Sequence, residues 1–250
     1  MKTPSLTWIV RRTRPFQIVI RALLRWLPES TVVRILSGPL QGSRWLLHSG
    51  VGGYWLGTYE PTQQNALTAM TKPGMVCYDC GANVGYYTLL LSRLVGPRGK
   101  VIAFEPLPRN VALLKRHVAM NGCSNVSIEE TALSNVDGTV RIHAAGPMSK
   151  IDPTGEIEVI CRKIDSLDLT PPDLMKIDIE GAELDMLAGA ESVIRAHHPS
   201  IVLSLHLTPT RARACAQSLE ALGYSVVWSA HDEICATHGS LGSGKGAPGS

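Results

Sequence analysis

Residues 77–88 read CYDCGANVGYYT, and two kinds of chemistry compete for this stretch. Two cysteines separated by two residues, Cys77 and Cys80, are typical of zinc and redox sites. An acidic residue followed by spaced glycines is typical of a loop that binds a nucleotide-like cofactor. If the first residues form a strand, the two cysteines point to opposite faces of a sheet, and no second pair is spaced to complete a zinc site. The sequence therefore predicts buried structural cysteines, with Cys77 filling space as a small hydrophobe.

The acidic and glycine residues form the pattern D-x-G-x-N-x-G, made of Asp79, Gly81, Asn83 and Gly85. This pattern falls between a predicted strand and a predicted helix, where a ligand meets the carboxyl edge of a parallel sheet. Gly81 permits a tight turn or a close backbone approach, and Gly85 removes a Cβ where the helix starts beside the ligand. We predict that all four residues bind a cofactor, the alternative being a plain glycine turn.

The glycine spacing separates two adenosine cofactors. A dinucleotide loop has the pattern G-x-G-x-x-G, whereas this loop has G-x-x-x-G, and Asp79 would repel a phosphate. S-adenosylmethionine carries a sulfonium cation and no phosphate, so an acidic loop with a carboxamide matches it. Glu105 follows the next predicted strand, and its carboxylate can accept both ribose hydroxyls, which either cofactor needs. The sequence favours S-adenosylmethionine and leaves an NAD-dependent oxidoreductase as the weaker alternative.

A second set of chemical groups lies in MKIDIEGAE and in the later strand SIVLSLH. Lys176, Asp178 and Glu180 share one face of a strand by the period of two, and the carboxylates come last, at the sheet edge. Asp178 is the leading candidate for the base that takes a proton from a hydroxyl acceptor, or for the group that orients that acceptor, and Glu180 and His206 are further catalytic candidates. The structural alternative is that Asp178 pairs with Lys176 and that Glu180 favours the N-terminus of a helix beginning near Gly181.

Two further assignments concern the same cleft. Asp178, Glu180 and His206 could bind a divalent cation, but their spacing matches no metal motif, so we predict no metal. Upstream, Tyr59 and Glu60 in GTYEP are expected to cover the methionine end of the cofactor, the alternative being ordinary turn residues.

Taken together, DCGANVG, AFEP and LMKIDIEGAE resemble the FkbM family of S-adenosylmethionine-dependent methyltransferases, and LGTYEP and ALSNVDGTV are also similar to it. The resemblance runs from about residue 50 to 230. It implies an α/β class I methyltransferase fold, Rossmann-like, with a seven-stranded, mostly parallel sheet and helices on both faces. Pro106, Ala132 and Asp178, which lie within or beside these motifs, are added to the predicted cofactor-binding residues.

The resemblance also implies O-methylation of a hydroxyl on a sugar, glycan or natural product. One departure is Ser204, which stands where relatives often have an acid and so puts the acceptor site in doubt. A catalytically degenerate cofactor-binding fold that acts through partners is therefore the alternative from a different functional class.

The elements that must position these residues alternate from Met75 onward, which predicts a parallel sheet covered on both faces. Antiparallel hairpins are predicted within 138–164 and 224–238. The remaining expected elements are strands at 75–79, 100–105, 125–130, 174–178 and 200–206, and helices at 84–96, 108–122, 181–198 and 209–223.

Three segments are predicted along the chain: an N-terminal extension at 1–60, a methyltransferase catalytic domain at 61–238 and a disordered tail at 239–250. The extension is expected to hold a helix at about 15–27, short strands within 35–47 and a turn-rich segment at 50–61. On a helical wheel Arg14, Arg21 and Arg25 cluster within about 40°, opposite an apolar face. That helix packs on the catalytic domain or attaches peripherally to an anionic membrane, which would suit a lipid-linked glycan acceptor.

Composition limits the remaining functions. A chain of 250 residues with 44% hydrophobic residues suits a single α/β domain. Residues 1–45 carry eight of its Lys and Arg against one acid, so the body is slightly acidic, and few aromatics accompany the basic residues. The sequence predicts no nucleic-acid partner and a small-molecule or glycan acceptor. Six cysteines without repeated spacing, no signal peptide and no long apolar run indicate a cytoplasmic protein, soluble or peripheral, of undetermined oligomeric state.

Overall fold

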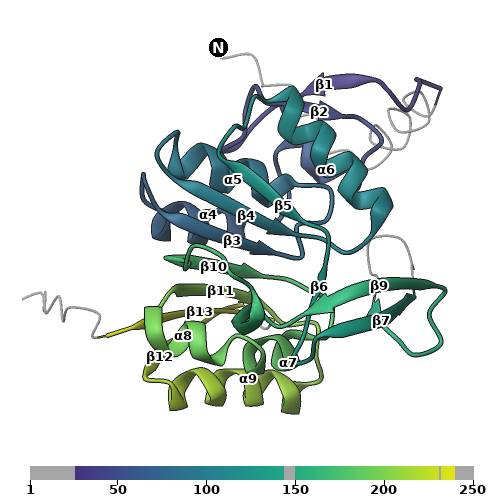
Figure 1. The fold of residues 1–250 in the computed structure, drawn as a ribbon. Helices are drawn as coiled ribbons and strands as arrows, with labels where there is room; N and C mark the ends of the chain where they lie inside the picture. Colours follow the sequence, from purple (N-terminus) through teal and green to yellow (C-terminus); the bar gives the residue numbers. More distant parts are fainter. Residues whose placement is uncertain (1–25, 144–149, 231, 240–250) are drawn as a thin grey trace, which may run out of the picture.

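The computed structural model describes residues 26–143, 150–230 and 232–239, and a seven-stranded sheet forms its centre (Figure 1). Five strands are mutually parallel, and β13 is antiparallel to both of its neighbours. The predicted α/β fold with a mostly parallel sheet is confirmed. In spatial order the strands are β12 (Tyr224–Ala230), β13 (Glu233–His238), β11 (Ser200–Ser204), β10 (Leu174–Ile177), β3 (Val76–Cys80), β4 (Lys100–Phe104) and β5 (Val126–Glu129).

Helices cover both faces of this sheet. One face carries α4 (Pro61–Met70), α5 (Tyr86–Val95) and α6 (Pro108–Met120), and the other carries α7 (Glu183–Ala188), α8 (Glu191–His197) and α9 (Pro209–Ala221). Because both faces are covered, the parallel strands are apolar on both sides.

The two cysteines of the opening stretch lie on opposite faces of the sheet. Cys77 belongs to the apolar cluster of α4 and α5, and Cys80 belongs to the cluster of α7, α8 and α9. Both are free, completely buried thiols. This confirms the prediction of structural cysteines and follows from the alternation of side chains along a strand.

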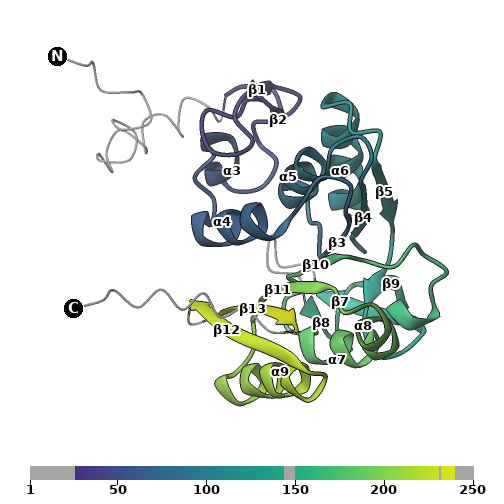
Figure 2. The same ribbon diagram turned by 90° about the vertical axis from the view of Figure 1, so that its left-hand side faces the viewer.

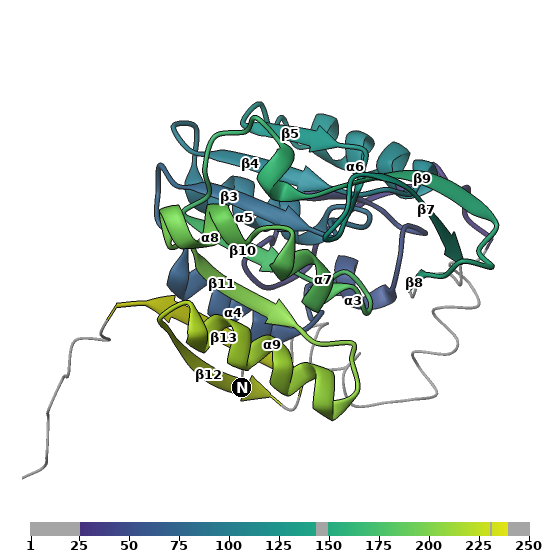
Figure 3. The ribbon, with the colours of Figure 1, turned by 60° about the horizontal axis from the view of Figure 1, so that its bottom comes forward.

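A smaller sheet projects beside the main one (Figure 3), in the order β6 (Ala132–Leu133), β9 (Ile157–Arg162), β7 (Gly138–His143) and β8 (Lys150–Ile151). The first predicted hairpin is confirmed in part: β7 pairs antiparallel with β9, but the short strand β8 comes between them in the chain and pairs with the other edge of β7. The antiparallel pairing of β12 with β13 confirms the second hairpin. Ile142 and Val159 of the small sheet pack against Leu107, which anchors it near the start of α6.

Two local expectations were wrong. The helix predicted at 181–198 is divided into α7 and α8, because the side chain of Asp165 accepts hydrogen bonds from the amides of Ser192 and Val193 and so caps a second helix. A Cβ added at Gly189, between them, would lie 2.0 Å from the carbonyl oxygen of Ser134, so the chain packs tightly there. The segment predicted to be turn-rich contains the short helix α3 (Gly52–Leu56).

The N-terminal extension packs against α5 and α6 (Figure 2) through β1 (Val32–Arg34) and β2 (Arg44–Leu46), which pair antiparallel. The ring of Trp45 stacks on that of His117 in α6 at a centroid distance of 3.8 Å. The predicted amphipathic helix lies almost wholly outside the described residues, as does the tail from 240. Within the described part of the chain, no helix has the length and apolarity needed to cross a membrane.

Candidate active site

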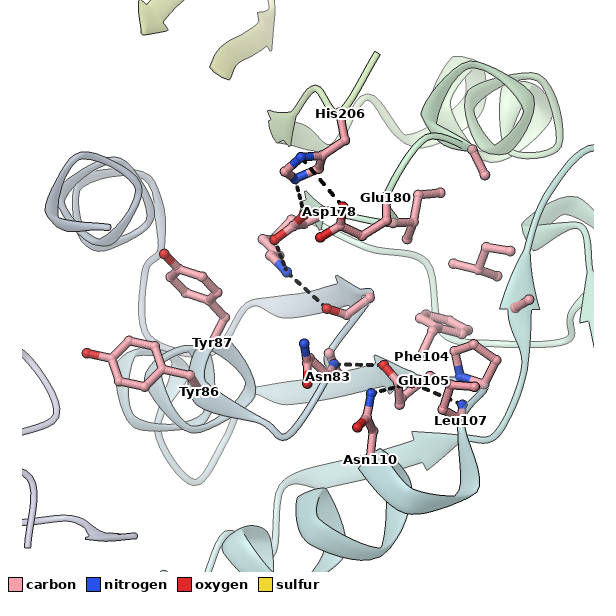
Figure 4. A pocket seen from close by; sticks show the side chains of 18 of the residues that line it. Asn83, Tyr86, Tyr87, Phe104, Glu105, Leu107, Asn110, Asp178, Glu180 and His206 are labelled. Atoms are coloured by element: carbon pink, nitrogen blue, oxygen red, sulfur yellow. Dashed lines mark hydrogen bonds and ion pairs between the residues drawn. The ribbon is translucent and has the colours of Figure 1, made fainter. Parts of the chain in front are cut away.

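A cavity of about 250 Å³ opens at the carboxyl ends of β3, β4 and β10 (Figure 4). The chain runs outward from β3 to β4 and β5 on one side and from β10 to β11 on the other, so the cavity lies where the strand order reverses. Parallel strands bring their carboxyl ends to one edge, which is why loops far apart in the sequence meet here. Most of the side chains singled out from the sequence line this cavity.

Glu105 lies directly after β4 and is held by three donors. Its carboxylate accepts hydrogen bonds from the amides of Asn83 and Leu107, at 2.8 Å and 3.0 Å, and from the side-chain amide of Asn110 at 3.2 Å. Burial raises the pKa of Glu105, and these hydrogen bonds oppose the rise. The result is a carboxylate of fixed orientation on the cavity wall, suited to accept a pair of hydroxyls.

The glycine loop between β3 and α5 has the backbone conformations that its residue types allow. Gly81 and Gly85 have φ values of 81° and 97°, and Asn83 has a φ of 50°. A Cβ at Gly81 would lie 1.9 Å from the carbonyl oxygen of Asp178, so this glycine permits the close approach of two loops. A Cβ at Gly85 would instead meet Leu114 of α6 at 2.6 Å. Gly81 and Asn83 line the cavity, whereas Gly85 lies outside its lining and serves helix packing.

Asp79 also differs from its expected place. Its side chain is fully buried beneath the cavity, where it accepts a 2.6 Å hydrogen bond from Thr88 and lies 3.3 Å from the ammonium of Lys176. It does not line the cavity. The parallel register pairs Lys176 with Asp79, and residues in register on neighbouring strands face the same side, so their side chains meet toward α5. Asp79 therefore lies behind Lys176, which lines the cavity in its place.

The opposite side of the cavity carries the three catalytic candidates. His206 Nε2 lies 2.8 Å from Asp178 Oδ1, and His206 Nδ1 lies 3.7 Å from Glu180 Oε2. The hydrogen bond to Asp178 raises the pKa of His206 to about 9. Burial raises the pKa of Asp178, but Lys176 and His206 outweigh that effect and hold it below its ordinary value. The pair is therefore an imidazolium and a carboxylate at neutral pH.

The same three side chains bring one ligand atom each to within 4.8 Å of one another. His206 already uses Nε2 for its short contact with Asp178, and carboxylate clusters of this kind occur without metals, so we assign no cation to them. Glu180 has a φ of 55°, which places it in the left-handed region that few residues other than glycine adopt. That conformation holds its side chain at the cavity after β10 has ended.

An aromatic wall closes the side of the cavity formed by α3, α4 and α5. Tyr54 and Tyr59 have ring centroids 4.4 Å apart, and the hydroxyl of Tyr87 donates a 2.9 Å hydrogen bond to Glu60. Tyr59, Glu60 and Tyr87 all line the cavity, together with Tyr86. Glu60 has a φ of 37°, so its backbone is strained where it enters α4.

The structure brings Glu60, Pro106 and Ala132 to the cavity with Glu105 and Asp178, as expected. Sequence reasoning missed other lining residues. Tyr86 and Tyr87 directly follow the glycine loop, and Asn110 lies in the first turn of α6, so their places in the sequence could have indicated a position at the cavity. Tyr54, Ile142 and Ile151 come from segments in which no sequence pattern indicates the cavity.

Ser204, the departure noted in the sequence, lies at the end of β11 and outside the cavity lining. Its hydroxyl accepts a hydrogen bond from Gln63 of α4, a residue that is itself buried. The serine therefore joins a helix to the sheet.

Residues 79–235 match the methyltransferase FkbM domain, which is more than half of the chain. This chain belongs to the FkbM methyltransferase family. The match covers the glycine loop, Glu105, the Asp178 loop and His206, so it contains both sides of the cavity. Glu60 and the extension lie before the matched residues.

Sequence relatives and solved structures agree with this family. Methyltransferase 1 of Beauveria bassiana is 24% identical over 143 residues, covering 45% of this chain and 57% of the relative. Hexuronic acid methyltransferase AglP of Haloferax volcanii is 22% identical over 144 residues, covering 52% and 56%. The chain thus spans somewhat more than half the length of these relatives.

The fold matches the crystal structure of a methyltransferase FkbM from Methylobacillus flagellatus with a TM-score of 0.52 at 21% identity, covering 66% of this chain and 44% of that one. An S-adenosylmethionine-dependent O-methyltransferase from Thermotoga maritima matches with a TM-score of 0.50 at 15% identity, covering 88% and 81%. At these identities the likeness establishes the class I methyltransferase fold.

The cofactor of this FkbM chain is S-adenosylmethionine, and the cavity residues fit it. Glu105 offers a fixed carboxylate to a ribose diol, while Glu60 and the tyrosine faces suit a sulfonium cation better than a pyrophosphate. The dinucleotide alternative therefore has no support from the family or from the charge of the site.

Proposed function

We propose that the protein is an S-adenosylmethionine-dependent O-methyltransferase that acts on a hydroxyl of a sugar, glycan or natural product. The observation that carries this proposal is the Asp178–His206 pair, 2.8 Å apart, on the same cavity as Glu105. One side of the cavity thus offers a cofactor anchor and the other offers a charged pair able to orient a hydroxyl and take its proton.

The proposed mechanism assigns each residue one task. S-adenosylmethionine, when bound, supplies an electrophilic methyl group. Asp178 accepts the proton that the acceptor hydroxyl loses as its oxygen bonds to carbon, and a positioned base of this kind contributes about 10² to 10⁴ in rate. His206 and Lys176 hold Asp178 ionised, while Glu180, which lies beside His206, orients the acceptor.

The acceptor class follows from the polar groups around Asp178. Carboxylates and an imidazole are hydrogen-bonding partners for several hydroxyls of one molecule. Ile142 and Ile151 of the small sheet add an apolar wall to the same cavity, which suits the carbon face of a sugar ring or a natural product. The relative described as a hexuronic acid methyltransferase supports a sugar acceptor.

The test is methyl transfer from labelled S-adenosylmethionine to an extract of small molecules and glycans, read by mass spectrometry. We expect a labelled product whose methyl group survives mild alkali, as an ether does and an ester does not. Asp178→Asn keeps the shape of the side chain and should lower the rate about 10² to 10⁴-fold while leaving cofactor affinity near that of the wild type. Unchanged turnover in that variant would remove Asp178 from the catalytic residues.

The degenerate-fold alternative makes the opposite prediction in the same experiment. It requires calorimetric binding of S-adenosylmethionine without any labelled product. The position of Ser204 outside the cavity lining, bonded to Gln63, supports the enzyme over this alternative, because the departure leaves Asp178, Glu180 and His206 on the cavity.

A peripheral membrane contact through residues 14–27 is a further part of the proposal. Residues 1–45 carry most of the basic excess, and Trp26, where the described chain begins, is 89% exposed. Each basic residue near an anionic surface contributes about 1 kcal/mol. Sedimentation with anionic vesicles should show salt-sensitive binding. The double variant Arg21→Glu with Arg25→Glu should abolish this binding, whereas Arg21→Lys with Arg25→Lys, which keeps both charges, should retain it. A protein left in the supernatant at low salt would end this part of the proposal.

A further inference from the structure

Lys176 is a cation buried at the base of the cavity, with only 2% of its side chain exposed. A lysine in such a place is costly unless it is paired, because its charge loses its water. Burial lowers the pKa of Lys176, but Asp79, Asp178 and Glu60 outweigh it and hold the pKa above the ordinary value. Lys176 is therefore charged, and its partners identify its role.

Four contacts surround its ammonium group, and they come from four separate parts of the site. Nζ lies 3.3 Å from Asp79 Oδ1 and 3.5 Å from Asp178 Oδ2. It donates a 3.2 Å hydrogen bond to the carbonyl oxygen of Gly81 and lies 5.1 Å from the centre of the Tyr87 ring. The end of β3, the glycine loop, the first turn of α5 and the Asp178 loop thus share one cation.

The two carboxylates on Lys176 are not equivalent. Asp79 is fully buried, and its other oxygen accepts a hydrogen bond from Thr88, so it has a complete structural role under the sheet edge. Asp178 is 17% exposed, lines the cavity and binds His206 through its other oxygen. Lys176 therefore contacts one carboxylate oxygen of Asp178, and His206 contacts the other.

We propose that Lys176 is a positioning residue for methyl transfer, which keeps Asp178 ionised and joins its carboxylate to the cofactor loop through Gly81. The inference rests on the proposed role of Asp178. A lysine that only neutralised Asp79 would be a structural residue, so the experiment must separate these two partners.

Other charged side chains also lie near Asp178 and affect the pH at which its carboxylate takes up a proton. His206 comes from the end of β11 and Glu180 from the same loop as Asp178. Glu60, at the start of α4, and Glu233, in β13, are near enough to act on the same group of charges. Since these further neighbours are carboxylates, they favour protonation of Asp178, and Lys176 is the buried cation that opposes them.

The test is the charge-matched double variant Lys176→Met with Asp79→Asn, compared with Asp79→Asn alone. Both variants remove the buried Asp79 charge, and only the double variant removes the ammonium beside Asp178. Carboxyl-labelled aspartate allows the Asp178 carbon to be titrated by NMR, its signal being assigned by its loss in Asp178→Asn. We expect the Asp178 titration to move upward by at least one pH unit in the double variant and to stay at or below the wild-type position in Asp79→Asn.

An Asp178 titration that is the same in the double and single variants would overturn the proposal and leave Lys176 as the partner of Asp79 alone. Circular dichroism first checks that each variant folds. If the double variant does not fold, the wild type still decides: Asp178 must titrate below the ordinary aspartate range, and a value within or above that range contradicts the proposal. The NMR titration does not measure methyl transfer. Its outcome can therefore be told apart from a failure of the proposed methyltransferase function.

Discussion

At the scale of single residues, Glu105 is the sharpest prediction for cofactor binding. Its carboxylate is fixed by three donors on the cavity wall, so its remaining capacity to accept hydrogen bonds is directed at a ligand. A hydrogen bond to a charged group contributes about 1.5 to 3 kcal/mol, and Glu105→Ala should therefore weaken binding of S-adenosylmethionine tenfold or more. Calorimetry measures the change, and Glu130→Ala, which removes an exposed carboxylate paired with Lys115, is the matched control. Equal affinities of the two variants would contradict the assignment.

His206 gives a prediction of pH dependence at the same scale. The hydrogen bond to Asp178 raises the pKa of His206 to about 9, so its positive charge persists through neutral pH and is lost as the pH rises through 9. If Asp178 is the base, turnover should be level between pH 6 and 8 and fall near pH 9, when the imidazolium that holds Asp178 loses its charge. A pH–rate profile at saturating cofactor measures this. A rate that rises with unit slope up to pH 9 would instead make neutral His206 the base.

At the scale of elements, the loop that carries Tyr59 and Glu60 depends on a close backbone contact. Gly57 has a φ of 73°, and a Cβ there would lie 1.8 Å from the carbonyl oxygen of Ser37 in the extension. Gly57→Ala should therefore be less stable than Gly42→Ala by about 1 to 3 kcal/mol, because Gly42 has a similar φ of 85° but open space around it. Urea unfolding gives both values, and calorimetry should show weaker cofactor binding for Gly57→Ala only. Equal free energies of unfolding for the two variants would mean that the extension can move away from the added methyl group without loss of stability.

Elements were predictable wherever a local pattern fixed them. Pro108 begins α6, and Gly122, with a φ of 64°, follows its end, as the sequence indicated. The division between α7 and α8 was not predictable from local patterns. The side chain that caps α8 belongs to Asp165, which lies well before both helices in the sequence. Helix α3 was missed because its two leading glycines read as turn residues.

The candidate site shows the same limit. The glycine loop, Glu105 and Asp178 follow strands, so the rule that ligands bind at carboxyl ends was enough to bring them together. The buried place of Asp79 depends on its register with Lys176 in a neighbouring strand, which no local spacing reports. Ile142 and Ile151 reach the cavity from a separate sheet, and only the three-dimensional structure relates them to it.

At the scale of the whole molecule, His117 joins the extension to the catalytic domain. Its Nδ1 donates to the carbonyl oxygen of Val84 at 2.6 Å, and its Nε2 accepts from the amide of Leu46 at 3.1 Å, so the buried ring is neutral. Burial lowers the pKa of His117 to about 4. Because the unfolded chain takes up the proton first, the stabilisation is present above about pH 6.5 and is lost as the pH falls toward 4, by about 3 kcal/mol in all.

The measurement is the free energy of unfolding at pH 7.5 and pH 5. His117→Gln should lose this part of the pH dependence, whereas His197→Gln, which changes an exposed ring, should retain it. A wild type and a His117→Gln variant with the same pH dependence would show that the ring is already able to take a proton in the folded protein.

The place of β13 has a consequence for how the chain is made. It is the last strand of the described chain, yet it lies between β11 and β12 and pairs with both. Among the described strands β13 alone joins β12 to the rest of the sheet, so during synthesis β12 leaves the ribosome before this bridge exists, and β11 presents an open apolar edge until β13 arrives. An edge of this kind is a template for pairing with other chains. We therefore expect nascent chains that stop before residue 233 to aggregate or recruit chaperones, and the arrival of β13 to be the step that closes the sheet.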